Sequence, residues 1–345
     1  MSTSKFKTIS VKNEWQKLLD DVEQYDFYHT YDYHHLSKAK GDIPILIKYE
    51  EDGVIIGLPF LMRRIFDTEY YDITSVYGYA GTLHKNVDEN YDNTKFIAQL
   101  IHYFNENKIV SVFSRLNPFI PFQETAIAKI GKISTLSKIV NIDITKNIDE
   151  QRTLFSKTTK RYINKARKLC LVKSGGTMED MQTFRDLYYE NMDRVQAKKS
   201  YYFNEAYFNS FINSSDFETD VLFAILKETN EIISAAMMVK TNNIIQYHIS
   251  GTRNDYLNLT PIRLLIDEMR IKGTEHNYTY FNLGGGLGSS EDSLFNFKAS
   301  FSKDFKDFKV WKHIVNQSVY DELSSQYANK SNDQSFFPLY RNSKL

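Results

Sequence analysis

Apolar and polar residues are spaced along the first half of the chain in a pattern that predicts a mixture of helices and strands. An aromatic-rich helical spacing comes first, and two strand-like runs joined by an acidic turn, typical of a β-hairpin, follow it. A helix with one apolar face and a short strand come next. The predicted elements are a helical stretch at 15–36, a hairpin at 43–49 and 54–61, a helix at 93–107 and a strand at 109–115.

The second half repeats this outline of helices, hairpin, strand, helix and strand. Its predicted elements are helices at 150–169 and 178–197, a hairpin at 221–226 and 232–240, a strand at 244–251, a helix at 260–272, a strand at 278–283, a short helix at 293–301 and a strand at 308–315. The repetition predicts an α/β (α+β) protein of two lobes, residues 1–146 and 147–345, each a mixed twisted sheet flanked by helices.

The composition narrows the functional classes. Of the 345 residues, 42% are hydrophobic and 25% charged, as in a globular protein that buries a core. The 43 Lys and Arg residues equal the 43 Asp and Glu residues in number, which argues against a general nucleic-acid binder, because such proteins carry a basic excess. The 24 Tyr and 24 Phe residues supply aromatic surfaces for core packing and for flat ligands such as sugars.

Several features predict a soluble cytoplasmic protein without a metal. Cys170 is the only cysteine, so no internal disulfide forms and a reducing compartment is expected. The N-terminal segment lacks the apolar core of a signal peptide, and no apolar run approaches the about 20 residues of a membrane span. His34 and His35 point in different directions on a helix and have no acidic or cysteine partner at ligand spacing. The oligomeric state stays open, and a monomer fits the sequence.

A set of motifs occurs together along the chain. The run Tyr280–Gly286 is a strand that ends in glycines, and a Phe-Lys pair in Leu294–Lys298 follows it. A basic segment at 156–166, the pair Ser250-Gly251 ahead of Thr260-Pro261, and the segments Phe27–His29 and Tyr77–Gly81 complete the set. Together these motifs resemble the Fem-like group of GNAT-superfamily acyltransferases, which covers peptidoglycan-bridge and sugar N-acyltransferases. The resemblance implies two GNAT-like lobes, of which 147–345 carries the acyl-donor site.

This resemblance implies transfer of an acyl group onto an amine, but it leaves the acyl carrier open. Most GNAT enzymes bind the pyrophosphate of coenzyme A with an Arg/Gln-x-x-Gly-x-Gly/Ala loop, and residues 251–259 lack that glycine pattern. Neutral charge favours acyl-coenzyme A (acyl-CoA) as donor and an amino sugar, linked to a nucleotide, as acceptor, for cell-envelope polysaccharide such as lipopolysaccharide. The alternatives are aminoacyl transfer from tRNA to a peptidoglycan precursor, and a non-catalytic binding protein on the same scaffold.

Three residues are candidates for the chemistry. His248 can take the proton that an attacking ammonium must lose, with Gln246 and Ser250 expected on the same strand face; a hydrogen-bonded structural histidine is the alternative. Glu190 is a second candidate base, or a solvated residue of its helix. Lys298, from its place in the Phe-Lys motif, is a candidate for stabilising an oxyanion or binding a phosphate, and an exposed lysine is the alternative.

Six residues are candidates for the acyl-donor site. The glycine-rich loop that begins at Gly284 and Gly285 can bind phosphates through backbone N–H groups, or be a tight turn. Thr260 as the cap and Pro261 at the first helical position open a helix whose N-terminus favours the carrier's pyrophosphate, with ordinary capping as the alternative. The last two candidates, Ser250 and Gly251, end the strand before that helix.

Five residues are candidates for binding the acceptor. Arg161 lies in the basic helix at 150–169, which has no acid after Glu150 and could bind phosphates of a nucleotide-linked substrate or of RNA. A solvated helix face is the alternative. The other four are aromatic: Tyr28, Tyr77, Tyr79 and Tyr247.

Overall fold

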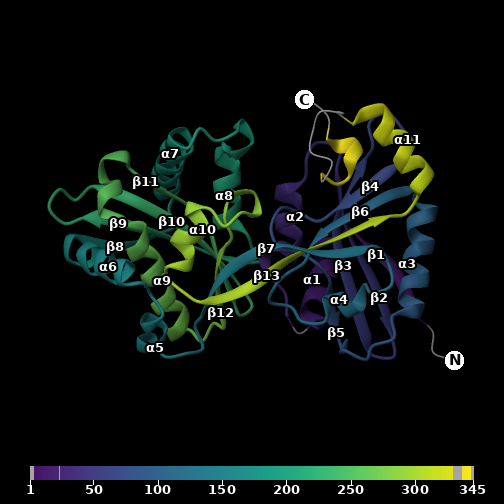
Figure 1. Ribbon diagram of the computed structural model, residues 1–345, viewed down its shortest axis with the longest axis horizontal. Coiled ribbons are helices and arrows are strands. Elements are labelled where there is room, and N and C mark those ends of the chain that lie inside the picture. Colours follow the sequence, from purple (N-terminus) through teal and green to yellow (C-terminus); the bar gives the residue numbers. More distant parts are fainter. Residues whose placement is uncertain (1–3, 23, 329–335, 343–345) are drawn as a thin grey trace. The chain divides into compact units, whose positions relative to one another are not determined.

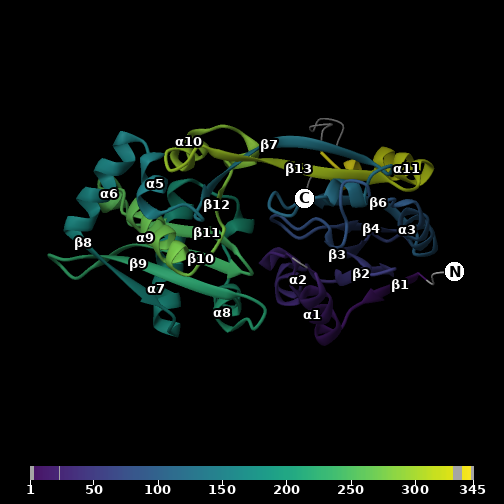
Figure 2. The ribbon, with the colours of Figure 1, turned by 90° about the horizontal axis from the view of Figure 1, so that it is seen from below.

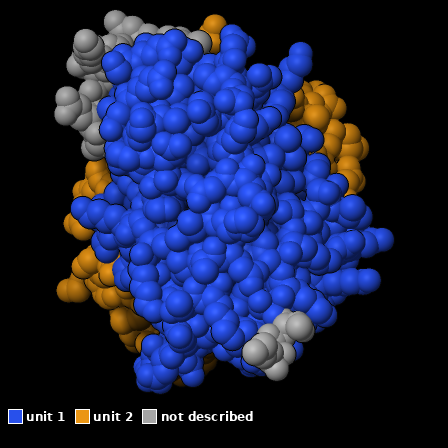
Figure 3. Space-filling model, turned by 90° about the vertical axis from the view of Figure 1, so that its right-hand side faces the viewer, with its two compact units in different colours: residues 1–136, 308–345 blue, residues 137–307 orange. Residues whose placement is uncertain are grey.

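The computed structural model describes residues 4–22, 24–328 and 336–342. The chain forms two compact units, one of residues 1–136 and 308–345 and one of residues 137–307 (Figure 3). Each unit contains a mixed sheet flanked by helices (Figures 1 and 2). The predicted α/β class is therefore confirmed.

In the first unit the strands lie in the order β1-β2-β3-β4-β6-β13, with the short strand β5 beside β3. All neighbours are antiparallel except β4 and β6, which run parallel. The strands are β1 (Lys5–Ile9), β2 (Ile43–Glu51), β3 (Val54–Arg64), β4 (Tyr71–Thr74), β5 (Leu83–Lys85), β6 (Ile109–Arg115) and β13 (Asp304–Ile314). The helices are α1 (Lys12–Asp21), α2 (Tyr31–Ser37), α3 (Thr94–Glu106), α4 (Gln123–Ala126) and α11 (Gln317–Tyr327).

In the second unit the order is β7-β12-β11-β10-β9-β8. Again all neighbours are antiparallel except one pair, β11 and β12, which runs parallel. The strands are β7 (Lys132–Asp143), β8 (Cys170–Gly175), β9 (Glu218–Leu226), β10 (Ile232–Thr241), β11 (Ile244–Thr252) and β12 (Tyr280–Gly284). The helices are α5 (Ile148–Thr153), α6 (Lys157–Leu169), α7 (Met178–Arg194), α8 (Glu205–Asn213), α9 (Ile262–Glu275) and α10 (Ser293–Ala299).

The two units share one strand order, read from β1 in the first and from β8 in the second, but their last strands are exchanged along the chain. β7 follows β6 in the sequence and pairs with β12, whereas β13 follows β12 and pairs with β6. The units therefore differ from the expected division into 1–146 and 147–345. Residues 308–345 belong to the first unit because β13 completes its sheet.

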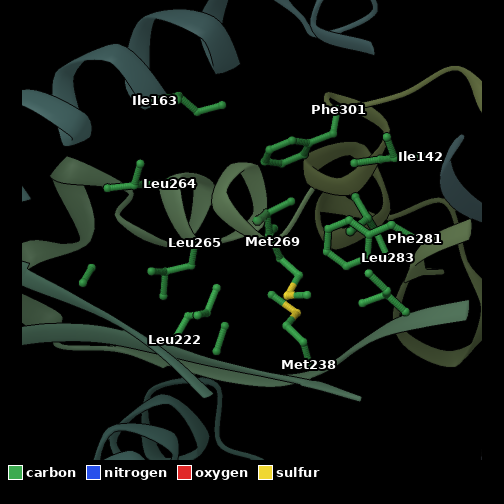
Figure 4. Packing of buried hydrophobic residues seen from close by; sticks show 14 of the residues in the cluster. Ile142, Ile163, Leu222, Met238, Leu264, Leu265, Met269, Phe281, Leu283 and Phe301 are labelled. Atoms are coloured by element: carbon green, nitrogen blue, oxygen red, sulfur yellow. The ribbon is translucent and has the colours of Figure 1, made fainter. Parts of the chain in front are cut away.

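Amphipathic helices on the sheets build the two cores. In α3 the buried residues Phe96, Leu100 and Phe104 recur at helical spacing and pack on the sheet of the first unit. In α9, Met269 points towards Met238 of β10, and Leu265 points towards Leu222 of β9 (Figure 4). Complete burial of each such side chain stabilises its unit by about 1.5–3 kcal/mol.

Local structure departs from the predicted elements at three places. The basic helix expected at 150–169 is two helices, because Ser156 caps α6 by accepting a hydrogen bond from the Thr159 N–H at 3.1 Å. The helical stretch at 15–36 is likewise divided, into α1 and α2, with a short 3₁₀ helix between them. Thr260 does not cap α9, since its backbone is left-handed (φ 45°) and its side chain makes no capping bond.

The described segments contain no helix both long and apolar enough to cross a membrane. Within the same segments, no three His, Cys, Asp or Glu side chains gather in a way that could hold a metal ion.

Candidate functional site in the second unit

The two parallel strands of the second unit pair over only three residues and then separate. Ile244–Gln246 of β11 pair with Tyr280–Asn282 of β12, whereas β11 continues to Thr252. At the last paired position the Asn282 side chain donates to Gln246 Oε1 at 2.8 Å and accepts from the Gly284 N–H at 2.8 Å. This buried amide pair fixes the point of separation. Sequence reasoning did not single out Asn282, although its place before the glycines was visible.

A β-bulge in β11 follows directly. Met237 and Met238 of β10 pair with Ile249 and Tyr247, so His248 has no residue opposite it. The bulge shifts the alternation of side chains, and the Tyr247 hydroxyl lies 2.5 Å from the Ser250 hydroxyl. The expectation that Gln246, His248 and Ser250 share one face was therefore wrong, because it assumed a regular strand.

His248 faces α8 and is surrounded by aromatic rings. Its Nε2 lies 2.8 Å from the Tyr207 hydroxyl, and the Phe211 ring centroid is 4.7 Å from the imidazole. Burial lowers the pKa of His248 from 6.5 to about 3, so the imidazole is neutral near pH 7. A group with so low a pKa accepts a proton only weakly.

Lys298 lies on α10 and is not an exposed lysine. Its Nζ donates to the Gly285 carbonyl at 2.7 Å, and the residue is only 9% exposed. Burial lowers the pKa of Lys298 to about 8, an effect that the carboxylate of Asp292 partly opposes. Asp292 also caps α10 by accepting from the Phe295 N–H at 2.9 Å. The helix thus fixes a buried cation beside the end of β12.

The glycine-rich loop after β12 is shaped by close contacts. Gly284 is left-handed, with φ 77°. A Cβ on Gly286 would lie 2.1 Å from the Ser290 carbonyl oxygen, so only glycine fits there. The Leu287 N–H donates to the Asp292 carboxylate at 3.1 Å, which closes the loop onto the start of α10.

Helix α7 holds the loop that leads from β11 to α9. The Glu190 carboxylate accepts from the Asn254 N–H at 2.6 Å, and Arg194 donates to the Thr252 carbonyl at 3.1 Å. At Gly251 the helix comes so close that a Cβ would lie 2.3 Å from the Leu187 carbonyl oxygen. Two predicted residues, Glu190 and Gly251, thus both lie where α7 meets the end of β11 and the loop after it, and Arg194 lies there too.

The start of α9 carries two polar atoms that have no partner in the described part of the chain. Among the described residues, no hydrogen bond reaches the buried Thr260 hydroxyl or the Arg263 Nε. The Arg263 Nη1 atom donates to the hydroxyls of Thr159 and Ser300 at 2.6 and 2.7 Å. Unsatisfied buried polar atoms at the N-terminus of a helix fit an anionic ligand such as a pyrophosphate, and Pro261 lies beside them.

The basic helix α6 uses part of its charge inside the unit. Arg167 donates to the buried carboxylate of Asp267 at 2.9 Å, and Arg152 of α5 lies 3.4 Å from it. Arg161 is exposed, with its guanidinium 5.2 Å from the Tyr162 ring centroid. The exposed cations of this helix therefore form a smaller set than the sequence suggested.

The remaining three candidates, Tyr28, Tyr77 and Tyr79, belong to the first unit. Tyr28 is buried beneath Gly78, where a Cβ would lie 2.0 Å from its ring. Tyr79 meets the Tyr28 ring edge to face at 5.7 Å. Tyr77 instead points outward and is 70% exposed.

The repeated strand order, with a bulged strand that separates from its parallel neighbour, defines a tandem GNAT fold. FemX matches with a TM-score of 0.70 at 14% identity, over 92% of this chain and 99% of that one. L-PGS from Bacillus licheniformis matches with a TM-score of 0.58 at 12% identity, over 91% of this chain and 95% of that one. A tandem GNAT protein from the clavulanic acid biosynthesis pathway matches with a TM-score of 0.50 at 8% identity, over 91% of this chain and 99% of that one.

These similarities concern the fold. No family model matches the sequence, and no curated protein matches it.

Proposed function

We propose that the protein is an N-acyltransferase that moves an acyl group from acyl-CoA to the amine of an amino sugar. The acceptor would be linked to a nucleotide and would serve cell-envelope polysaccharide synthesis. The observation that carries this proposal is the separation of β11 from β12 after Gln246 and Asn282, beside the buried ammonium of Lys298. A cytoplasmic site of action agrees with the single buried, unpaired cysteine, Cys170.

The acyl donor would bind along the separating strands of the second unit. Its pyrophosphate would lie at the start of α9, where the Thr260 hydroxyl and the Arg263 Nε lack partners among the described residues. Ser250 and Gly251 would contact the donor through their backbone, and the loop at Gly284 and Gly285 would border the acyl group. Glu190 and Arg194 would act as positioning residues, because both bind the loop after β11.

The reaction would form a C–N bond and break the C–S bond of the thioester. The amine attacks the carbonyl carbon, negative charge develops on its oxygen, and the Lys298 ammonium stabilises that charge in a site of low solvent access. A base takes the amine proton and then gives it to the departing thiolate, so coenzyme A leaves as a thiol. His248 is the candidate acceptor of that proton, with Tyr207 fixing its ring, although its low pKa makes it a weak base.

A second candidate function is aminoacyl transfer from tRNA to a peptidoglycan precursor. The exposed cations that remain on α6, Lys157, Arg161, Lys165 and Lys168, favour it, as does the similarity to FemX. The charge of the whole chain, which is zero, favours the amino-sugar reaction.

Release of free thiol, measured over a panel of acyl-CoA donors and amino-sugar nucleotides, tests the proposal. We expect turnover with at least one pair. Absence of turnover and of calorimetric binding of acetyl-CoA and coenzyme A, together with tight binding of aminoacyl-tRNA, would reverse the order of the two functions.

A further inference from the structure

Arg115, at the end of β6 in the first unit, has no acceptor for its guanidinium in the described part of the chain. The group is half-buried and lies over two aromatic rings, 4.9 Å from the Phe113 centroid and 5.6 Å from the Tyr77 centroid. Within residues 4–22, 24–328 and 336–342 it forms no ion pair, and its side-chain N–H groups donate no hydrogen bond. Burial lowers the pKa of Arg115, but arginine stays charged near pH 7.

Other arginines of the same unit are paired. Arg63 and Arg341 both bind the buried carboxylate of Asp72, at 2.7 and 2.8 Å. The guanidinium of Arg115 instead lies over aromatic rings and faces no carboxylate among the described residues, so its N–H groups remain available to a ligand. Such a group is a candidate for recognising an anion.

The loop that holds Tyr77 over Arg115 is fixed from behind. The Tyr33 hydroxyl donates to the Tyr77 carbonyl at 2.9 Å, and the Asn117 side chain donates to the Tyr79 carbonyl at 2.7 Å. His29 Nε2 lies 2.6 Å from the Ala80 carbonyl. These contacts hold the backbone in place while the Tyr77 ring stays 70% exposed. A fixed loop that presents an exposed ring beside a cation is preorganised for a ligand.

We propose that Arg115 and Tyr77 bind a sugar acid, with the carboxylate on the guanidinium and the flat face of the sugar on the Tyr77 ring. The guanidinium fork matches a carboxylate in a bidentate manner. The single positive charge of one guanidinium balances a carboxylate fully but a pyrophosphate only in part. This inference deepens the proposed function: the acceptor would be an amino sugar that carries a carboxyl group.

A titration of the full chain with three matched sugars tests the proposal without requiring turnover. The sugars are glucuronate, glucose and glucose 6-phosphate, which differ only in the group at C6, and the readout is the NMR signal of the arginine Nε–H groups. Since a charge-assisted hydrogen bond is the difference, we expect glucuronate to bind about tenfold or more tightly than glucose. Tyr77→Ala should weaken the binding of glucuronate and of glucose by the same factor.

Arg115→Gln should abolish the preference for glucuronate, and Arg115→Lys, which keeps the charge without the fork, should retain part of it. Arg64→Gln is the control, because Arg64 is exposed and its guanidinium donates to the Thr68 carbonyl rather than to Tyr77 or Arg115. Equal binding of glucuronate and glucose by the wild type, or an unchanged preference in a folded Arg115→Gln variant, would overturn the proposal. Tighter binding of glucose 6-phosphate than of glucuronate would also overturn it, in favour of a phosphate site. Thiol release fails or succeeds independently, so the two proposals are tested separately.

Discussion

The Lys298 ammonium donates a hydrogen bond to the Gly285 carbonyl at 2.7 Å, and this bond joins α10 to the loop that follows β12. The cation is nearly buried, yet it makes one hydrogen bond within the described segments, which leaves two N–H groups for a ligand. A cation held in this way is suited to a developing oxyanion, because the protein has already met the cost of orienting it.

Replacing Lys298 by Met should remove that stabilisation. We expect kcat to fall by about a hundredfold or more, since one oxyanion donor is worth roughly 3–4 kcal/mol. Steady-state kinetics with the best acyl-CoA and acceptor pair measures the effect. Lys303→Met is the matched control, because Lys303 is exposed and donates to the Ala299 carbonyl at 3.2 Å, away from the glycine-rich loop. A rise in KM with unchanged kcat would instead assign Lys298 to substrate binding.

Lys298 should also make folding stability depend on pH in a distinctive direction. Its pKa is lowered from 10.5 in the unfolded chain to about 8 in the folded one, so between these values the unfolded state binds more protons. Stability therefore rises with pH from about 8 towards 10.5, by up to about 3 kcal/mol. Urea unfolding of the wild type and of Lys298→Met at pH 7.5 and 9.5 should show a larger gain for the wild type. An equal gain in stability for the two proteins would mean that the pKa of Lys298 in the folded state is close to its ordinary value.

His248 should contribute to loss of stability in acid. Its folded pKa of about 3 lies below the unfolded value of 6.5, so only the unfolded state gains a proton as the pH falls between them. The wild type should lose about 2 kcal/mol more than His248→Gln between pH 7 and pH 5. His29 and His34 are also buried with lowered pKa values and remain in both proteins, so the difference isolates His248. If His248 is the base, the same variant should lower kcat as well.

The close approach of α7 to β11 gives a steric prediction. Gly251→Ala would place a Cβ 2.3 Å from the backbone oxygen of Leu187, and the helix must shift. We expect a loss of about 1–3 kcal/mol in the free energy of unfolding. Gly176→Ala is the control, since a Cβ there would meet no atom within 4 Å, and it should change stability little. Urea denaturation of both variants measures the effect. Equal stability of the two variants would mean that α7 and β11 tolerate the added Cβ.

Hydrophobic spacing predicted most elements, because local pattern and packing agree there. The strand Ile109–Arg115 has its expected bounds, and α3 begins one residue inside the expected 93–107. The exchange of β7 and β13 could not be predicted, since the partner of a strand is set by contacts distant in sequence. The bulge at His248 was not predicted for a related reason, because register is a property of the strand pair β10 and β11.

The candidate site shows the same limit. The motif at Gly284–Lys298 was visible in the sequence, and the structure brings Lys298 to Gly285. Arg115 carries no motif, and only its environment distinguishes it: two aromatic rings and no acceptor among the described residues. Environment of this kind depends on the folded loop at Tyr77 and is not encoded in local spacing.

Substitutions of Glu190 distinguish the general base that the sequence allowed from the positioning residue that the structure indicates. Its carboxylate accepts from the Asn254 N–H at 2.6 Å, which ties α7 to the loop between β11 and α9. If Glu190 positions this loop, Glu190→Gln keeps an acceptor oxygen and should hold kcat within about threefold. Glu190→Ala leaves the amide unpaired, and KM for the acyl donor should rise roughly tenfold, as expected for loss of a hydrogen bond to a charged group. If Glu190 is the general base, the Gln variant should instead lose about a hundredfold or more in kcat, like the Ala variant, because neither can accept the amine proton. The contrast between Gln and Ala, measured as kcat and KM separately, therefore decides which role the carboxylate has.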